Sequence, residues 1–268
     1  MIRQTFAEYV ADEAVNWSSL KHMDDSALHY RHRLSAERKD TAALALGRVT
    51  HSLVFEPDTL DREYAVYEGG NRIGKEWTAF AETNEGKTIF KPAEIANAVA
   101  MAAAVRAHPL VQPYLDGGLF ETTIRWTDAE TGLVCKARPD WMVPDRRWLV
   151  DLKTARSVHP RMFGRAVASY GYHRQLAHYA AGIEAACGWR PEKVVLIAVE
   201  NTAPFDVVVY EMTDDALIVG RQDVDRLLTK LAYHRKTDTW PGRFSEEQVL
   251  DLPEWIIGDL EISTDEGA

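Results

Sequence analysis

The spacing of apolar residues changes along the chain, and this change separates predicted helices from predicted strands. Residues 41–55 place apolar side chains three and four positions apart, which predicts a helix that ends before Pro57. The Ala-rich residues 93–107 predict a second helix, which stops before Pro109. Residues 58–92, between the two, are polar and irregular. We therefore expect the first half of the chain to be mainly helical.

After residue 118 the period shortens to two. Alternating apolar and polar positions predict three strands, at residues 119–126, 133–138 and 147–153. A turn around Pro144-Asp145 precedes the third strand, so the three strands are expected to form an antiparallel meander.

Helices and strands then alternate to the end of the folded part. Helical spacing returns over 160–186 and over 214–235, with two strands between them at 194–200 and 205–211. This order predicts an α/β or α+β fold in which helices cover a sheet. The chain shows no clear linker before about residue 240, so we expect a single domain over 1–240 and a tail over 241–268.

The composition excludes several classes of protein. The 268 residues include 46% hydrophobic and 27% charged residues, which is ordinary for a globular protein, and only two cysteines. Two thiols cannot form a disulfide scaffold, a four-cysteine zinc site or a four-thiolate iron–sulfur cluster. No apolar stretch is long enough to span a membrane, and the N-terminus lacks the apolar core of a secretory signal. We therefore expect a cytoplasmic protein that does not act at a membrane.

The clearest chemical pattern combines Asp140 with the triplet Asp151-Leu152-Lys153. Because strand residues i and i+2 point to one face, Asp151 and Lys153 lie together while Leu152 faces the core. The returning strand brings Asp151 beside Asp140, and adjacent carboxylates repel each other unless a cation separates them. Oxygen ligands suit Mg²⁺ or Mn²⁺, and a lysine beside such an ion can position a water for phosphodiester hydrolysis. An Asp-x-Lys triplet alone is more often a surface ion pair, but the preceding Arg-Pro-Asp favours a site.

Three segments together resemble the PD-(D/E)XK nuclease superfamily, and more narrowly the RecE-type (exodeoxyribonuclease VIII-like) phage and prophage exonuclease domain. The segments are TAALALGRVTHSLVFEP (41–57), KARPDWMVPDRRWLVDLKTA (136–155) and YGYHRQLAHY (170–179). The similarity extends over roughly residues 15–235. It implies a restriction-endonuclease-like core, in which helices flank a central mixed sheet, with an N-terminal helical portion.

The resemblance implies roles for the residues of the Asp-x-Lys pattern. Asp140 and Asp151 would be metal ligands, together with the main-chain carbonyl of Leu152. Lys153 would be the catalytic lysine. Without the resemblance, these charged residues could equally form ordinary ion pairs.

Four further residues receive roles from the same resemblance. Gln175 and Tyr179 match a Q-x-x-x-Y motif, share one helix face at i and i+4, and would contact substrate or support the metal site. His51 matches a G-x-x-x-H helix and would bind the metal or lie beside it. Glu121 takes the place of an acidic residue that often completes such sites. The simpler interpretations are a core or rim histidine and a hydrogen-bonded pair on a helix.

The function implied by the resemblance is hydrolysis of linear double-stranded DNA from the 5′ end with Mg²⁺, for which Mn²⁺ would substitute. The product would carry 3′ single-stranded tails for recombination. The implied partners are double-stranded DNA ends and a single-strand annealing protein, and the implied assembly is a homo-oligomeric ring. The alternatives are a RecB-like repair or structure-specific endonuclease, and a non-catalytic DNA-binding protein with the same fold.

The formal net charge of −10 argues at first against a nucleic-acid-binding protein. However, residues 136–175 contain nine basic and three acidic residues, a local balance of +6. Residues 244–268 contain eight acidic residues and no basic one. A basic track around a metal site suits a phosphate backbone. For Arg161 and Arg165, a solvated helix face is the alternative.

Overall fold

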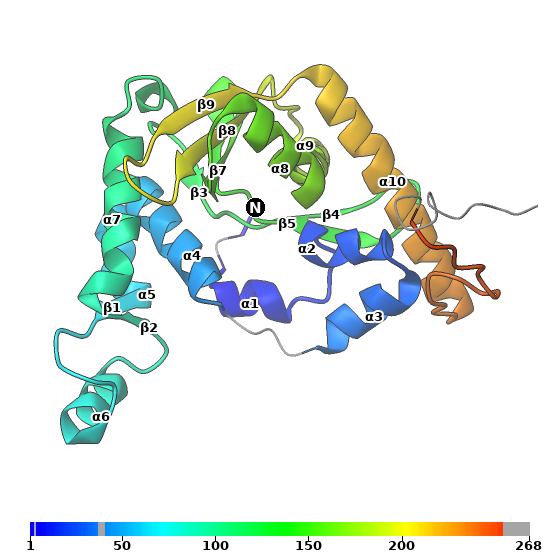
Figure 1. Cartoon of the computed structure of the whole chain (residues 1–268). Coiled ribbons are helices and arrows are strands. Elements are labelled where there is room, and N and C mark those ends of the chain that lie inside the picture. Colours follow the sequence, from blue (N-terminus) through cyan, green and yellow to red (C-terminus); the bar gives the residue numbers. More distant parts are fainter. Residues whose placement is uncertain (3, 37–40, 254–268) are drawn as a thin grey trace, which may run out of the picture.

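The computed structural model describes residues 1–2, 4–36 and 41–253. A five-stranded sheet with the order β3-β6-β7-β8-β9 forms its centre (Figure 1). The strands are β3 (Leu119–Phe120), β6 (Trp141–Val143), β7 (Trp148–Ala155), β8 (Lys193–Glu200) and β9 (Val207–Glu211). Strands β7 and β8 run parallel, and the other neighbours run antiparallel, so the sheet is mixed, as predicted.

Two helices make the crossover that a parallel pair requires. They are α8 (Pro160–Tyr170) and α9 (Tyr172–Cys187), which join β7 to β8. The sequence predicted helical structure over 160–186, and the structure divides it at Gly171, whose φ of 69° ends α8 in a left-handed turn.

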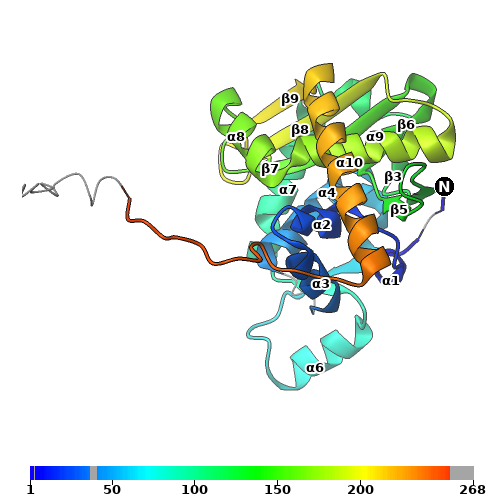
Figure 2. The same ribbon diagram turned by 90° about the vertical axis from the view of Figure 1, so that its right-hand side faces the viewer.

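The central strands bury both faces between two helical layers. Leu149 of β7 and Leu196 of β8 pack in the same core cluster as residues of α9 and α10 (Asp214–Thr237). Their neighbours Val150, Leu152 and Ile197 pack in a second cluster with residues of α4 (Ala42–Phe55) and α7 (Pro92–Ala107). Figure 2 shows α10 crossing in front of α9. Burial of both faces explains the continuous apolar run of β8 and confirms the predicted fold class.

An N-terminal group of short helices packs against α9 and α10. It consists of α1 (Phe6–Ala11), α2 (Trp17–Leu20), a 3₁₀ turn (Lys21–Met23) and α3 (Ala27–Ser35). Asn16 and Ser26 cap α2 and α3 through their side chains. Asp24 pairs with Arg174 and Arg226, which connects this group to α9 and α10.

The segment that the sequence left irregular contains several short elements. They are a 3₁₀ turn (Pro57–Thr59), α5 (Leu60–Glu63), β1 (Tyr64–Val66), α6 (Gly74–Thr83) and β2 (Thr88–Phe90). Strands β1 and β2 form a parallel pair, and α6 projects from the body of the molecule (Figure 1).

The prediction of one meander at 119–153 is wrong in two respects. Residues 119–126 form two strands in different sheets, β3 and β4 (Ile124–Thr127), because Glu121 between them has a φ of 40°. Strand β5 (Val134–Ala137) pairs with β4 in a separate sheet, so the partner of β7 is the unpredicted β6. The turn at Pro144 is confirmed as a 3₁₀ turn (Pro144–Arg146).

The other predicted elements are confirmed to within two residues at each end: α4, α7, β8, β9 and α10. A further 3₁₀ turn (Gln112–Tyr114) follows α7. Of the predicted tail, residues 254–268 lie outside the described residues, and Arg243 near its start pairs with Asp25. Within the described part, no helix combines the length and the apolar character that a membrane span needs.

Because His178 of α9 is buried, we expect the protein to lose stability in acid. Its Nε2–H donates to the carbonyl of Lys136 at 3.2 Å, and burial lowers its pKa to about 4 from its usual 6.5. The stabilisation by the neutral ring is complete above pH 6.5, and about 3 kcal/mol of it is lost as the pH falls to 4. In urea unfolding at a series of pH values, His178→Gln should lack this dependence. Parallel curves for the two proteins would contradict the assignment.

Candidate active site

Asp140, directly before β6, connects strand β7 to helix α4. Its Oδ2 accepts a hydrogen bond from the main-chain N–H of Leu152 in β7 at 2.9 Å. Its Oδ1 lies 3.3 Å from Nδ1 of His51, which comes from α4 on the other side of the sheet. The sequence predicted that the returning strand would bring Asp151 near Asp140, and the bond to Leu152 confirms this closeness.

Asp151 and Lys153 point from β7 towards α9, on one face as predicted. Lys153 Nζ lies 2.6 Å from Asp151 Oδ2, and it donates to Gln175 Oε1 at 3.1 Å. Gln175 Nε2 in turn donates to the hydroxyl of Tyr179 at 2.7 Å. Leu152 between them is fully buried in the opposite core cluster. One chain of contacts therefore joins Asp151, Lys153 and the Q-x-x-x-Y pair.

The two carboxylates influence each other's protonation. Burial and the nearby charge of Asp140 raise the pKa of Asp151 to about 6. Burial also acts to raise the pKa of Asp140, but the charge and hydrogen bond of His51 outweigh it and lower that pKa. Burial lowers the pKa of the Lys153 ammonium group, but the charges of Asp151 and Asp140 outweigh this effect, so that the pKa is raised. The lysine is therefore a cation at neutral pH.

Glu121 lies beside this group and is held by Arg138. Arg138 Nη2 lies 2.6 Å from Glu121 Oε2, and Arg138 Nε donates to the Glu121 carbonyl at 3.0 Å. The N–H of Glu121 donates to the carbonyl of Asp140 at 3.1 Å. Burial raises the pKa of the Glu121 carboxyl, and the charge of Asp140 raises it further against the opposing effect of Arg138. The structure thus places Glu121 next to Asp140 through the main chain, with its carboxylate on Arg138.

The chemistry of these donors fits a divalent cation. Asp151 is fully buried, and its Oδ1 has no hydrogen-bond partner among the described residues. A buried carboxylate oxygen without a donor is costly, and a bound cation would compensate for it. In the described ranges, no group of three or more His, Cys, Asp and Glu side chains is gathered into a complete ligand set. The ligand roles of His51, Glu121 and the Leu152 carbonyl therefore stay predictions.

Two residues that interact with Lys153, one by contact and one through its charge, were not singled out from the sequence. The ring of Tyr172 lies 4.7 Å from Lys153 Nζ, measured to its centroid. Tyr172, Gln175 and Tyr179 lie at i, i+3 and i+7 on α9, so helical spacing could have identified Tyr172. Lys21 was not marked by any motif. Burial lowers the pKa of its ammonium group, and the charges of Arg33 and Lys153 lower it further.

The basic track predicted over 136–175 is only partly present. Several of its cations are used internally: Lys136 is buried and donates to the carbonyls of Tyr9 and Asp12, Arg138 pairs with Glu121, Arg147 with Glu192, and Arg174 with Asp24 and Asp223. No ion pair among the described residues involves Arg156, Arg161 or Arg165. These three follow Lys153 in sequence, at the end of β7 and on α8.

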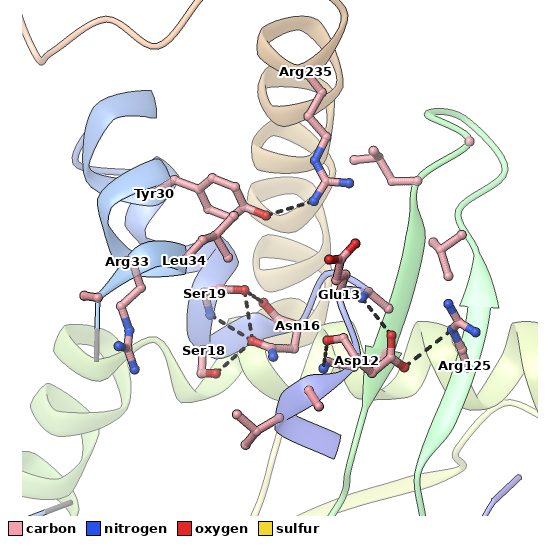
Figure 3. A pocket seen from close by; sticks show the side chains of 18 residues that line it. Asp12, Glu13, Asn16, Ser18, Ser19, Tyr30, Arg33, Leu34, Arg125 and Arg235 are labelled. Carbon is pink, nitrogen blue, oxygen red and sulfur yellow. Dashed lines mark hydrogen bonds and ion pairs between the residues drawn. The ribbon is translucent and has the colours of Figure 1, made fainter. Parts of the chain in front are cut away.

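A large cavity lies away from the carboxylates. It has a volume of about 920 Å³ between the N-terminal segment, α3, the β4–β5 pair and α10, and none of the candidate catalytic residues lines it (Figure 3). Its charged groups are partly satisfied, since Arg125 pairs with Asp12 and Arg235 donates to Tyr30 (Figure 3). A smaller hollow of about 390 Å³ adjoins the site, and Glu121 and Arg138 line it.

A family model described as "PDDEXK-like domain of unknown function (DUF3799)" matches residues 16–251. No curated protein matches the sequence. The match extends over most of the chain and confirms the resemblance to the PD-(D/E)XK superfamily.

Two solved structures are similar. One is a candidate exonuclease from Eubacterium rectale, with a TM-score of 0.66 at 15% identity, covering 96% of this chain and 98% of that one. The other is a phage-related exonuclease from Haemophilus somnus 129PT, with a TM-score of 0.37 at 13% identity, covering 87% and 99%. The first likeness shows that the two chains share a fold.

Divalent cations should stabilise the protein through Asp151. At an ion concentration 100 times the Kd, Mn²⁺ or Mg²⁺ is expected to raise the free energy of unfolding by about 2.7 kcal/mol. Asp151→Asn, which removes the charge at nearly constant volume, should abolish this response and the heat of binding in titration calorimetry. Asp145→Asn, in the exposed turn before β7, is the matched control and should retain both. An equal response in the Asp151 variant would rule out this carboxylate as a ligand.

Proposed function

Because the chain belongs to the family of PDDEXK-like domains DUF3799, we propose that it is a metal-dependent nuclease, and more narrowly an exonuclease that degrades linear double-stranded DNA. The observation that supports this most strongly is the contact chain from Asp151 through Lys153 to Gln175, beside Asp140. The PD-(D/E)XK nucleases generally use divalent metals, and a recessed carboxylate pair next to a lysine is chemically suited to hydrolysis of a phosphodiester.

Asp140 and Asp151 would hold the cation, which we propose to be Mg²⁺ with Mn²⁺ as a substitute. When bound, the ion would lower the pKa of a water and neutralise charge on the scissile phosphate. His51 holds Asp140 through its Oδ1, and the Leu152 N–H holds the other oxygen. These two bonds fix the orientation of the carboxylate before any ligand arrives, which reduces the reorganisation needed on binding.

Lys153 would act as a cation and hydrogen-bond donor. Because Asp151 and Asp140 raise its pKa, the ammonium form prevails at neutral pH, and Lys153 is poorly suited to remove a proton. Its positive charge instead favours the negative charge that develops on the phosphoryl oxygens during attack. Gln175 positions the ammonium group through its Oε1, and Tyr179 positions Gln175. The Q-x-x-x-Y pair is thereby given a positioning role.

Action at a DNA end is supported by the burial of the site and by the family resemblance. The side chains of Asp140 and Lys153 are only 14% and 15% exposed, so a phosphodiester must enter a recessed site. A strand end enters such a site more readily than the middle of a duplex. The fold likeness to the Eubacterium rectale candidate exonuclease is in keeping with this proposal.

The narrower parts of the proposal concern direction and partners. We propose 5′ to 3′ degradation that leaves 3′ single-stranded tails, delivery of these tails to a single-strand annealing protein for recombination, and assembly into a homo-oligomeric ring. These parts derive from the resemblance of segments 41–57, 136–155 and 170–179.

Lys153→Ala should lower the rate of DNA hydrolysis by about 100-fold or more, because the variant lacks the cation beside the scissile phosphate. The rate is measured as release of nucleotides from linear duplex DNA in Mg²⁺. Lys230→Ala, an exposed lysine of α10, is the matched control and should retain full activity. Full activity of a folded, metal-loaded Lys153→Ala protein would refute the mechanism.

Covalently closed circular DNA should remain intact under conditions in which linear DNA of the same sequence is degraded. The reason is that a closed circle offers no strand end to the recessed site. Gel electrophoresis of both substrates after equal incubation makes the measurement. Cleavage of the circle would instead identify the RecB-like or structure-specific endonuclease, and hydrolysis of neither substrate would favour a non-catalytic DNA-binding protein.

A further inference from the structure

Two tyrosines flank the glycine that separates α8 from α9. The ring centroids of Tyr170 and Tyr172 lie 5.6 Å apart with an interplanar angle of 33°. Tyr170 is 63% exposed, so one face of its ring is open to a ligand. Gly171 between them has a φ of 69°, and its turn brings the two rings together.

The support beneath this pair is well packed. A Cβ on Gly171 would lie 2.9 Å from the ring of Trp17 in α2, so the turn is seated directly on that side chain. Tyr172 also contacts the buried Phe163, at 6.5 Å between ring centroids. Phe163 stacks on Tyr210 of β9 at 5.1 Å. The exposed ring of Tyr170 is therefore presented by a fixed framework, and little side-chain entropy would be lost on binding.

The tyrosine pair adjoins the candidate catalytic lysine. Tyr172 lies 4.7 Å from Lys153 Nζ, and Lys153 lies 2.6 Å from Asp151. Tyr170 is thus separated from the proposed metal ligands by only one ring and one ammonium group. Its helix also carries Arg161 and Arg165, exposed cations for which no ion pair is formed with a described residue. Helix α8 thus carries an exposed π-face at its C-terminal end and exposed cations in its preceding turns, and a nucleic-acid strand offers flat bases and charged phosphates to match both.

We propose that Tyr170 and Tyr172 form a stacking site for the nucleobase next to the phosphodiester that is hydrolysed. This inference depends on the nuclease function proposed above and adds a contact for the base. Every base has a π-face, so such a site holds the strand without selecting a sequence. The tyrosine pair would hold the terminal nucleotide while Lys153 acts on the adjacent phosphate. This site would give a role to Tyr170, whose exposed ring takes no part in the proposed metal chemistry.

Binding of a DNA end tests the stacking site. The probe is a duplex with nuclease-resistant phosphorothioate linkages and 5-iodouracil at one of its first terminal positions. Tyr170→Ala should raise the Kd about 5-fold to 100-fold, the range produced by loss of one base–aromatic stack. Tyr170→Phe should bind as the unaltered protein does, because stacking requires the ring and not the hydroxyl. Irradiation should crosslink the iodouracil to the peptide that contains Tyr170 and Tyr172.

Tyr233 provides the matched control. It is 61% exposed on α10, so Tyr233→Ala removes an equally accessible ring and should leave the Kd unchanged. If the unaltered protein hydrolyses DNA but Tyr170→Ala binds equally well and the crosslink forms elsewhere, the stacking site is refuted while the nuclease remains. If the unaltered protein neither binds nor hydrolyses DNA, the proposed function fails and the stacking site fails with it.

Discussion

Repulsion between the buried carboxylate of Asp151 and the partly buried one of Asp140 is the constraint on which the rest of the site depends. Asp151 is fully buried close to Asp140, and each would be costly there as an isolated charge. Three groups offset this cost. The N–H of Leu152 and the imidazole of His51 contact Asp140, and the ammonium group of Lys153 contacts Asp151. Asp151 Oδ1 still lacks a hydrogen-bond donor, so the compensation is complete only for Asp140. This asymmetry is what a cation would correct.

Strand β7 can carry this charge because its two faces have different functions. Val150 and Leu152 anchor it in the core against α4 and α7, while Asp151 and Lys153 face α9. A shift of one residue in register would place the lysine in the apolar cluster against α4 and α7 and the leucine in the site, so the pairing with β6 and β8 fixes the chemistry as well as the sheet. Helix α9, which Lys153 faces, also supplies Gln175. Core packing and the site are therefore determined by the same strand pairings.

The parts predictable from sequence are those with a local period. The shared face of Asp151 and Lys153 follows from strand alternation, and α4 and α10 follow from helical spacing. Strand β6 could not be recognised, because its three residues are all buried and show no alternation. At the break between β3 and β4, Glu121 forms an ion pair with Arg138. These two residues are far apart in sequence, so no local spacing of residues predicts their contact. The approach of His51 to Asp140 is likewise long-range, and only the family motif indicated it.

Counting charged residues along the sequence was a poor guide to where free charge lies in the structure. Counting assigned a balance of +6 to residues 136–175, but four of those cations are buried or paired with carboxylates elsewhere in the fold. Arg174, for example, pairs with Asp24 and Asp223 and so holds the N-terminal helices against α9. Its charge is used within the fold and does not attract DNA. Of the remaining cations, Arg146 lies in the turn before β7, whereas Arg156, Arg161 and Arg165 follow Lys153, the last two on the same helix as Tyr170. Under the proposed nuclease function, the attraction for phosphate would come from these three arginines, which follow the point where β7 leaves the carboxylates, and it would be local, because the chain as a whole is acidic.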